Sequence, residues 1–324
     1  MPPLTRKEIV ELLRLRDREQ AWLFDRARAM RRQHFGDTAV VRGVIEVTSV
    51  CVQNCSYCPM RRDNRMTRYS YRTEEIVALS KDIRDAGIRV VSLQGGDTPR
   101  TTQIVGDAIG AIRAVFDGDV DILLVLGDKP RQDYVHLRDC GADSYILKHE
   151  TSDAQQHLEH RYYPLAQRLA NLEVLLALGY RVGTGTIVGL PGQTLEMLAD
   201  DILLARSLGV HMCSASPFVP ATDTPLADAP PGDIELTLNT LAAMRLVLPD
   251  ALIPSVSALE HRSPGGQVAG FNAGANVVTV NFTPEPDRVN YPIYGADRFV
   301  VGRRHAAAVL QQAEMRSSLT PVNA

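Results

Sequence analysis

Three closely spaced cysteines carry the strongest chemical signal in the sequence. Cys51, Cys55 and Cys58 follow an apolar, β-branched run, on a stretch too short to form a packed core of its own. Three thiolates this close cannot all pair as disulfides, but they can bind one inorganic centre. A cubane of four irons takes four ligands, so three cysteines leave one iron open for chemistry. The alternative is a structural zinc ion, although no other Cys or His between His34 and His136 supplies its fourth ligand.

The pattern C-x-x-x-C-x-x-C, with Tyr57 directly before the last cysteine, resembles the signature of the radical S-adenosylmethionine (SAM) superfamily. In that superfamily the cysteines hold a [4Fe-4S] cluster, and the amino and carboxylate groups of SAM bind the fourth iron. Reductive cleavage of SAM gives a 5′-deoxyadenosyl radical, which abstracts hydrogen from an unactivated carbon. The resemblance implies an enzyme with one cluster per chain, SAM, and an external electron donor such as flavodoxin or ferredoxin.

Further segments resemble the SAM-binding elements of that superfamily. The stretch Gln94-Gly95-Gly96-Asp97 resembles its Gly-Gly-Glu motif, whose main chain holds the SAM ammonium, with Asp97 in place of Glu. Glu150 can accept hydrogen bonds from an ammonium or a ribose hydroxyl. The resemblance assigns the SAM carboxylate to Arg168 and an adenine contact to the strand around Val188. Ordinary turns, helix caps or surface positions are the alternative interpretations.

Longer stretches narrow the resemblance to the biotin-synthase-like group, with the [FeFe]-hydrogenase maturase and methylornithine synthase as the nearest patterns. These stretches are Tyr57–Asn64, His149–Thr151, Val188–Thr194, Pro217–Pro220, Asp223–Ala227, Leu248–Asp250 and Gly274–Val278. The maturase pattern Ile-Pro-Ala-Thr-Thr-Ala reads here as Ile253–Ala258, in which Val256 replaces a hydroxyl-bearing residue. No Cys follows Cys213, so a second cluster is not expected.

The function implied is radical chemistry on a small metabolite, either hydrogen abstraction or radical addition. The departure at Val256 favours carbon-skeleton rearrangement or C–C bond formation in amino-acid or natural-product biosynthesis. Assembly of a metallocofactor of the hydrogenase type is the first alternative. A non-catalytic iron–sulfur or zinc protein that binds SAM is the second.

Candidate substrate groups are polar residues near the predicted strand ends. They are Arg61, Asp223, Ser255, Ser257, Asn276 and Asn281. Turn capping and hydrogen bonding at the rim of a barrel explain the last five equally well, and a salt bridge is the alternative for Arg61. Beyond the cluster ligands, the sequence assigns no catalytic residue.

From about residue 40 onward, short apolar runs alternate with amphipathic stretches, which predicts parallel βα units. The predicted strands are residues 43–48, 89–94, 119–127, 143–148, 181–188, 211–217, 252–258 and 276–281. The predicted helices are residues 73–86, 101–116, 130–140, 165–178, 194–208, 233–248 and 264–273. Eight such units predict an α/β fold, the (βα)8 TIM barrel, whose chemistry gathers at the C-terminal ends of the strands.

Helical segments are expected on both sides of the barrel, which we place at residues 40–295. A capping box at Thr5–Glu8 opens an N-terminal extension over residues 1–39, in which the basic pair Arg31-Arg32 is expected on a solvated face. Residues 284–294 are expected to form a loop. The C-terminal extension, residues 296–324, is expected to hold a helix at 302–315 and a frayed end from Ser317.

Composition limits the kinds of partner. The chain has 324 residues, 45% of them hydrophobic, and a net charge of −3 with both signs interspersed. This gives no electrostatic basis for nucleic acid or an anionic membrane as partner, so a small-molecule substrate is expected. No apolar run approaches the roughly 20 residues of a membrane span, and a signal-peptide core is lacking. Five cysteines, three of them clustered, do not form a disulfide framework, so a cytoplasmic location is expected.

Overall fold

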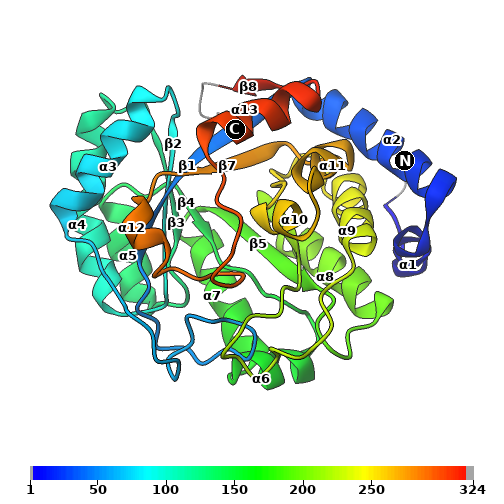
Figure 1. Cartoon of the computed structure of the whole chain (residues 1–324), viewed down its shortest axis with the longest axis horizontal. Helices are drawn as coiled ribbons and strands as arrows, with labels where there is room; N and C mark the ends of the chain where they lie inside the picture. The colour runs from blue at the N-terminus through cyan, green and yellow to red at the C-terminus, as the bar shows by residue number, and fades with distance from the viewer. Residues whose placement is uncertain (1–2, 319–324) are drawn as a thin grey trace.

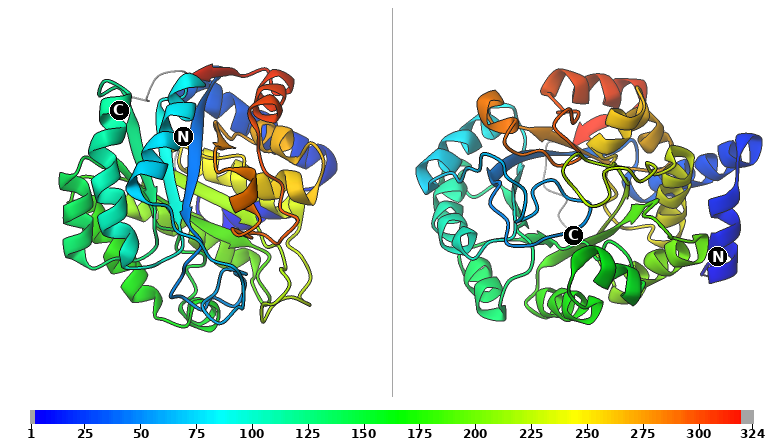
Figure 2. Two further views of the ribbon diagram at one scale, coloured as in Figure 1. Left: turned by 60° about the vertical axis from the view of Figure 1, so that its left-hand side comes forward. Right: turned by 60° about the horizontal axis from the view of Figure 1, so that its bottom comes forward.

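The computed structural model describes residues 3–318, and its centre is a curved parallel β-sheet surrounded by helices (Figure 1). Figure 2 shows the sheet curling around a central space, with helices on its outer side. The strands follow the order β6-β5-β4-β3-β2-β1-β7. Their bounds are β1 (Thr38–Thr48), β2 (Val90–Gly95), β3 (Asp121–Val125), β4 (Ser144–Ile146), β5 (Arg181–Val188), β6 (Met212–Pro217) and β7 (Val277–Asn281). This arrangement confirms the predicted α/β barrel of radical SAM type.

The predicted strand at residues 252–258 is much shorter than expected. Leu252 forms a single β-bridge with Met212 of β6, and Pro254 forms one with Val277 of β7. The segment thereby closes the ring between β6 and β7. It ends early because helix α10 (Ser257–Arg262) begins three residues after Pro254, which has no N–H to donate to a ladder.

Most helices lie on the outside of the sheet, where the alternation predicts them. They are α3 (Thr73–Asp85), α4 (Arg100–Val115), α5 (Arg131–Asp139), α7 (Leu165–Ala177), α8 (Leu195–Leu208), α9 (Ile234–Val247) and α11 (Gly266–Asn272). The sequence does not predict α6 (Ala154–Arg161), α10 or α12 (Glu285–Arg288), because these short, polar segments carry little periodic apolar signal. The start of α6 is fixed by Asp153, whose carboxylate accepts the Gln156 N–H.

The N-terminal helices pack against the outer helices of the barrel. Helix α1 (Arg6–Arg14) begins at the predicted capping box, in which the Glu8 carboxylate accepts the Thr5 N–H at 2.8 Å. Helix α2 (Asp17–Phe35) lies along α9 (Figure 1). The solvated position expected for Arg31 is wrong: this side chain is buried and donates to the Phe271 carbonyl at 2.8 Å.

The C-terminal segment ends in a strand instead of a frayed end. Helix α13 (Arg303–Gln312) leads into β8 (Arg316–Ser318), which pairs in parallel with Thr38–Val40 of β1. The rest of the expected frayed end, residues 319–324, lies outside the described residues. Within residues 3–318, none of the helices is long and apolar enough to cross a membrane.

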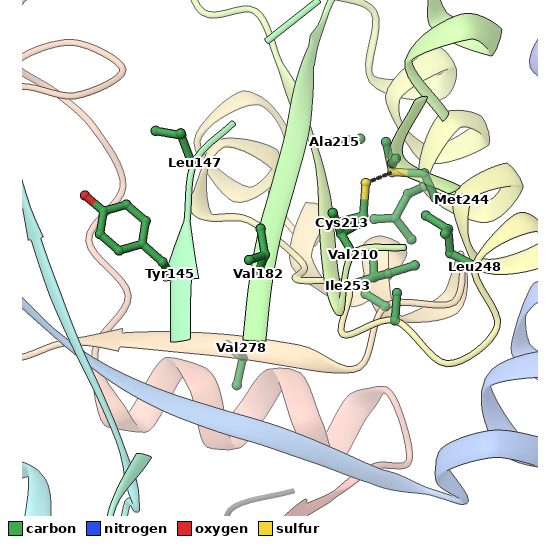
Figure 3. Packing of buried hydrophobic residues seen from close by; sticks show 14 of the residues in the cluster. Tyr145, Leu147, Val182, Val210, Cys213, Ala215, Met244, Leu248, Ile253 and Val278 are labelled. Atoms are coloured by element: carbon green, nitrogen blue, oxygen red, sulfur yellow. Dashed lines mark hydrogen bonds between the residues drawn. The ribbon is translucent and has the colours of Figure 1, made fainter. Parts of the chain in front are cut away.

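Two apolar layers lie on the two faces of the sheet. Part of the outer layer, between strands and helices, is drawn in Figure 3, where the Cys213 thiol lies 3.7 Å from the Met244 sulfur. Because side chains alternate along a strand, the neighbouring Met212 points to the inside of the barrel. The inner layer, here called the apolar floor, lies towards the N-terminal ends of the strands and consists of Val40, Val90, Leu123, Met212 and Val277.

Candidate functional site

A cavity of about 370 Å³ reaches from the loops at the C-terminal ends of the strands into the barrel. Its lining includes the loop after β1, the end of β2 and the start of the segment after β4. Inward-facing side chains of β1, β6 and β7 line its deeper part. A volume in this range is typical of small-molecule sites, and its position is the one where (βα)8 enzymes place their chemistry.

All three clustered cysteines line this cavity, and none of the chain's five cysteines forms a disulfide within the described structure. Their loop is tied down on two sides. The Val52 N–H donates to the Asp97 carbonyl at 2.7 Å, and the Ser56 N–H donates to the His160 carbonyl at 2.9 Å. These bonds fix the loop against the end of β2 and against α6. The cysteines are therefore held in place by the fold.

The three thiols resist ionisation in the protein alone. Burial raises the pKa of all three, and the pKa of Cys58 reaches about 12, with the neighbouring Cys55 and Cys51 as further causes. Bound iron supplies the positive charge that deprotonates such thiols. Within residues 3–318 no three His, Cys, Asp or Glu side chains gather where one metal ion could bind them all. A [4Fe-4S] cubane does not require such a group, because each cysteine binds a different iron.

The glycine pair after β2 holds the cysteine loop close to the sheet. A Cβ on Gly96 would lie 2.2 Å from the Val50 carbonyl oxygen and 2.9 Å from the Cys51 Cβ, whereas one on Gly95 would meet only side-chain carbons of Thr48 and Val47, at 3.0 and 3.1 Å, as its nearest neighbours. The second glycine thus lets main chain approach main chain. Both glycines line the cavity, so the predicted contact with the SAM ammonium stays a prediction of this site.

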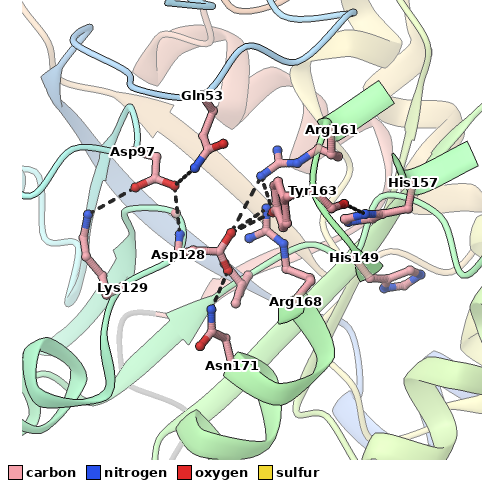
Figure 4. Close-up of polar contacts among 12 residues, drawn as sticks. Gln53, Asp97, Asp128, Lys129, His149, His157, Arg161, Tyr163, Arg168 and Asn171 are labelled. Carbon is pink, nitrogen blue, oxygen red and sulfur yellow. Dashed lines mark hydrogen bonds and ion pairs between the residues drawn. The ribbon is translucent and has the colours of Figure 1, made fainter. Parts of the chain in front are cut away.

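Asp97, which follows the glycines, is buried and bonded within the protein (Figure 4). Its carboxylate accepts the Gln53 side-chain amide at 2.9 Å and lies 3.6 Å from the Lys129 ammonium. Burial raises the pKa of Asp97, while the charge of Lys129 acts in the opposite direction. These contacts link the cysteine loop to the loop after β3. These contacts explain the burial of Asp97 even when no ligand is bound. The predicted cofactor contact of Asp97 is supported only by its position in the cavity lining.

Glu150 lines the cavity in a left-handed backbone conformation, with φ of +66°. Such a conformation costs a residue with a side chain about 1–3 kcal/mol, and the surrounding structure must hold it. Here the Glu150 N–H donates to the Gly185 carbonyl at 2.9 Å, and its carbonyl accepts the Ile187 N–H at 3.0 Å. The carboxylate lies 3.3 Å from the Lys148 ammonium. The strained turn therefore presents a charged acceptor to the cavity, as the SAM-binding prediction requires.

Arg168 also lines the cavity, although its helix position gives only a weak signal in the sequence. It is buried, with its guanidinium 3.2 Å from Asp128 and 5.4 Å from the centre of the Tyr163 ring. Asp128 also accepts the Tyr163 hydroxyl at 2.7 Å and the Asn171 amide at 2.8 Å (Figure 4). The sequence analysis missed Asp128, which fixes the guanidinium in place. Other N–H groups of the Arg168 guanidinium can donate to the carboxylate of a ligand.

Of the other predicted cofactor residues, Gln94 and Tyr57 line the cavity and Val188 does not. Val188 is fully buried in the outer apolar layer, and its neighbour Ile187 faces the cavity instead. Alternation along β5 explains the exchange, because adjacent side chains lie on opposite faces. The Val188 side chain thus faces away from the cavity, and the adenine contact predicted for this strand stays a prediction.

The predicted substrate residues divide into two groups. Ser255, Ser257 and Asn281 line the cavity, while the structure places Arg61, Asp223 and Asn276 outside its lining. Asn276 precedes β7, so it lies at the opposite end of the strand from the site, and its buried amide oxygen accepts the Arg245 guanidinium at 3.0 Å.

The other two residues outside the lining have partners or positions of their own. The Arg61 Nε–H donates to Asn54 at 2.8 Å, beside the cysteine loop. Asp223 is exposed in the segment after β6, with φ of +61°. Neither side chain is part of the cavity lining, so their substrate contacts stay predictions.

Some charged residues of the cavity lining were not predicted from the sequence. Arg298, from the loop before α13, forms a two-pronged ion pair with Glu46 of β1, with distances of 2.5 and 2.7 Å. Arg42, also on β1, lies deeper. Inward alternation along β1 is the one signal that could have pointed to Arg42 and Glu46, because they share the face of Val40 and Val44.

Comparison with known proteins identifies relatives of this chain. The family model "Radical SAM superfamily" matches residues 45–205. The [FeFe] hydrogenase maturase subunit HydE of Thermotoga maritima is 38% identical over 294 residues, covering 90% of this chain and 84% of the relative. The 3-methylornithine synthase of Methanosarcina barkeri is 27% identical over 314 residues, covering 91% and 84%.

A crystal structure of methylornithine synthase superposes with a TM-score of 0.85 at 24% identity, covering 98% of this chain and 94% of that one, and so shows the same fold. Radical SAM enzymes use a [4Fe-4S] cluster and SAM, act on small substrates and need a reductant. The cysteine trio in the cavity lining, the fold and the 38% identity together show that the chain belongs to the radical SAM superfamily, in its biotin-synthase-like group.

Proposed function

We propose that this radical SAM enzyme rearranges a carbon skeleton or forms a C–C bond in a small amino-acid-like metabolite. The observation that carries the proposal is the single cavity, in which the three cysteines and the polar interior of the barrel share one lining. A radical generated beside the cluster loop would meet a substrate inside the barrel without crossing bulk water. Val256, the departure from the maturase pattern, lies in that lining, so the sequence difference falls where a substrate would bind.

The bound cluster and SAM supply a 5′-deoxyadenosyl radical, and the chain's residues prepare the site for it. Cys51, Cys55 and Cys58 hold the cluster. We assign the SAM ammonium to the main chain at Gly95 and the SAM carboxylate to Arg168; both residues line the cavity, which supports the assignment. Glu150, raised into the cavity by its strained turn, is a charged acceptor for an ammonium or ribose hydroxyl. The enclosed barrel keeps water and other hydrogen donors away from the reacting carbon.

The test is SAM cleavage by the anaerobically reconstituted enzyme with dithionite. We expect release of 5′-deoxyadenosine, and no release above background from the Cys58→Ala variant. Perdeuterated amino acids, supplied one at a time, should then transfer deuterium to 5′-deoxyadenosine when the correct substrate class is present. Cleavage without transfer from any amino acid would refute the substrate class and leave the SAM chemistry standing. No cleavage at all would refute both.

Assembly of a metallocofactor is a second candidate, favoured by the 38% identity with the hydrogenase maturase subunit. Complementation separates the two candidates. A bacterial strain that lacks its own maturase of this type should regain hydrogenase activity when it expresses the chain, if assembly is the function. Under the first proposal, the strain stays inactive even though the expressed protein cleaves SAM.

We further propose flavodoxin or ferredoxin as the electron donor and the cytoplasm as the location. The free cysteines of the described chain support a reducing compartment, which an iron–sulfur cluster needs. Replacing dithionite by each donor protein with its reductase tests the first point. Fractionation of the native host tests the second.

A further inference from the structure

A polar layer lies directly above the apolar floor of the barrel. On four strands, the residue two positions after a member of the apolar floor is polar and lies on the same face of the strand. These polar residues are Arg42 on β1, Ser92 on β2, Ser214 on β6 and Thr279 on β7. All four line the cavity, and Arg42 pairs with Thr279 in the register of β1 and β7. The deeper part of the cavity therefore combines one cation with three hydroxyl-bearing residues in its lining.

The Arg42 guanidinium lacks the acceptors that a buried arginine needs. Its side chain is 4% exposed, and its one side-chain hydrogen bond to the described residues goes to the thioether sulfur of Met212, at 3.1 Å. A thioether is a weak acceptor, while a guanidinium has five N–H donors. Burial lowers the pKa of Arg42 to about 10.

Arg245 shows how this protein satisfies a buried arginine when the role is structural. Arg245 is fully buried and donates to the carbonyls of Gly274, Pro249 and Ala251, at 2.8–2.9 Å, and to the amide oxygen of Asn276 at 3.0 Å. Arg42 has no such set of oxygen acceptors among the described residues. The contrast indicates that the acceptors of Arg42 come from a ligand.

The carboxylates that face Arg42 already have partners. Asp121, at the start of β3, attracts Arg42 but forms its ion pair with Arg181. Glu46, higher on β1, is held by Arg298. The floor of the cavity thus keeps one positive charge uncompensated, which is a match for one negative charge on a ligand.

We propose that Arg42, with Ser92, Ser214 and Thr279, binds the carboxylate of the substrate at the floor of the cavity. The planar fork of an arginine suits a carboxylate, and the three hydroxyls can donate to its oxygens. The inference rests on the proposed function, which it deepens by orienting the substrate. Six residues separate Arg42 from Thr48, where the cysteine loop begins, or roughly 20 Å along the strand. The carboxylate is then the end of the substrate furthest from the cluster, and the reacting carbon lies towards the mouth.

Bromide provides a probe that does not depend on catalysis. Crystals of the reconstituted enzyme soaked in bromide should show an anomalous peak beside the Arg42 guanidinium, and excess acetate should displace it. In Arg42→Met, bromide binding should weaken about 10- to 100-fold, as expected for losing hydrogen bonds to a charged group, and Arg42→Lys should retain part of it. Absence of the peak in the unmodified enzyme overturns the proposal. A peak that acetate cannot displace overturns the assignment to a carboxylate.

Thermal stability distinguishes ligand binding by Arg42 from a structural role of this residue. Arg42→Met should unfold at a temperature equal to or above that of the unmodified enzyme, whereas Arg245→Met, the matched control, should unfold at a lower temperature. A loss in Arg42→Met as large as in the control would make Arg42 structural and overturn the proposal. Failure of the proposed SAM chemistry would abolish cleavage in every variant, and failure of the proposed substrate class would leave cleavage without deuterium transfer. Neither outcome alters the bromide result.

Discussion

Gly96→Ala tests whether the glycine pair positions the cluster. In the structure the Gly96 N–H donates to the Thr48 carbonyl at 3.0 Å, so this residue is bonded to the end of β1. A methyl group on Gly96 would point at the Val50 carbonyl oxygen, at 2.2 Å. Ordinary van der Waals contact begins at 3.4 Å, so the loop or the strand end must retreat by about 1.2 Å. Because the atom in the way is main chain, no side-chain rotation relieves the clash.

The retreat should be visible in both stability and catalysis. Overpacking of this kind typically costs about 1–3 kcal/mol of folding free energy. A displacement of about 1 Å at a reacting group can lower a rate about 100-fold, and Cys51 lies directly beside the clash. We therefore expect reconstituted Gly96→Ala to bind less iron per chain and to release 5′-deoxyadenosine about 100-fold more slowly.

Two alanine variants serve as controls for Gly96→Ala. Gly110→Ala lies on α4 with no atom within 4 Å of the new methyl group, so it should keep full activity and gain about 1 kcal/mol of stability. Gly95→Ala should be milder, because its nearest contacts are side-chain carbons at 3.0 and 3.1 Å. Full iron content and an unchanged rate in Gly96→Ala would refute the claim that this glycine sets the position of the loop.

Further predictions concern the charged residues of the site. Arg298→Met should lower the free energy of unfolding by about 3–5 kcal/mol in urea denaturation, because it leaves the buried Glu46 carboxylate without its partner; no loss would contradict the ion pair. Glu150→Gln should weaken SAM binding about 10- to 100-fold in equilibrium dialysis, whereas exposed Glu159→Gln should not, and equal affinities would remove Glu150 from the SAM site. Burial lowers the pKa of His157 below that of the unfolded chain, about 6.5, so its neutral form stabilises the fold above that pH and this contribution is lost as the pH falls below it. Denaturation at pH 7.5 and 5.5 should show a larger loss for the natural chain than for His157→Gln, and parallel losses would contradict this.

Local signals in the sequence were enough to predict the fold class and to single out the three cysteines that line one cavity. The cysteine spacing and the capping box at Thr5 depend on neighbours a few residues apart, so the sequence reports them directly. The long strands β1 and β5 were also predictable, because their apolar runs are flanked by turns. The strand at residues 252–258 was not, since the start of α10 at Ser257 shortens it and its two bridges depend on strands that lie far away in the sequence.

The inside of the barrel was the least predictable part of the site. Glu46 and Arg298 are separated by 252 positions, and no local pattern links them. Val188 and Ile187 differ only in the phase of alternation, which a continuous apolar run does not reveal. The sequence places Asn276 at the end of a strand, but only the direction of β7 shows that this is the N-terminal end, away from the site.

The short closing segment at Leu252 and Pro254 has a consequence for motion. Elsewhere the strands are joined by ladders of several residue pairs, but here single bridges complete the ring. Local opening costs less where fewer residues are paired, so the wall between β6 and β7 is a place where the barrel can open while the remaining sheet stays intact. Ser255 and Val256 lie in that closing segment and line the cavity. Movement of the segment would therefore widen the cavity and let it accept larger ligands.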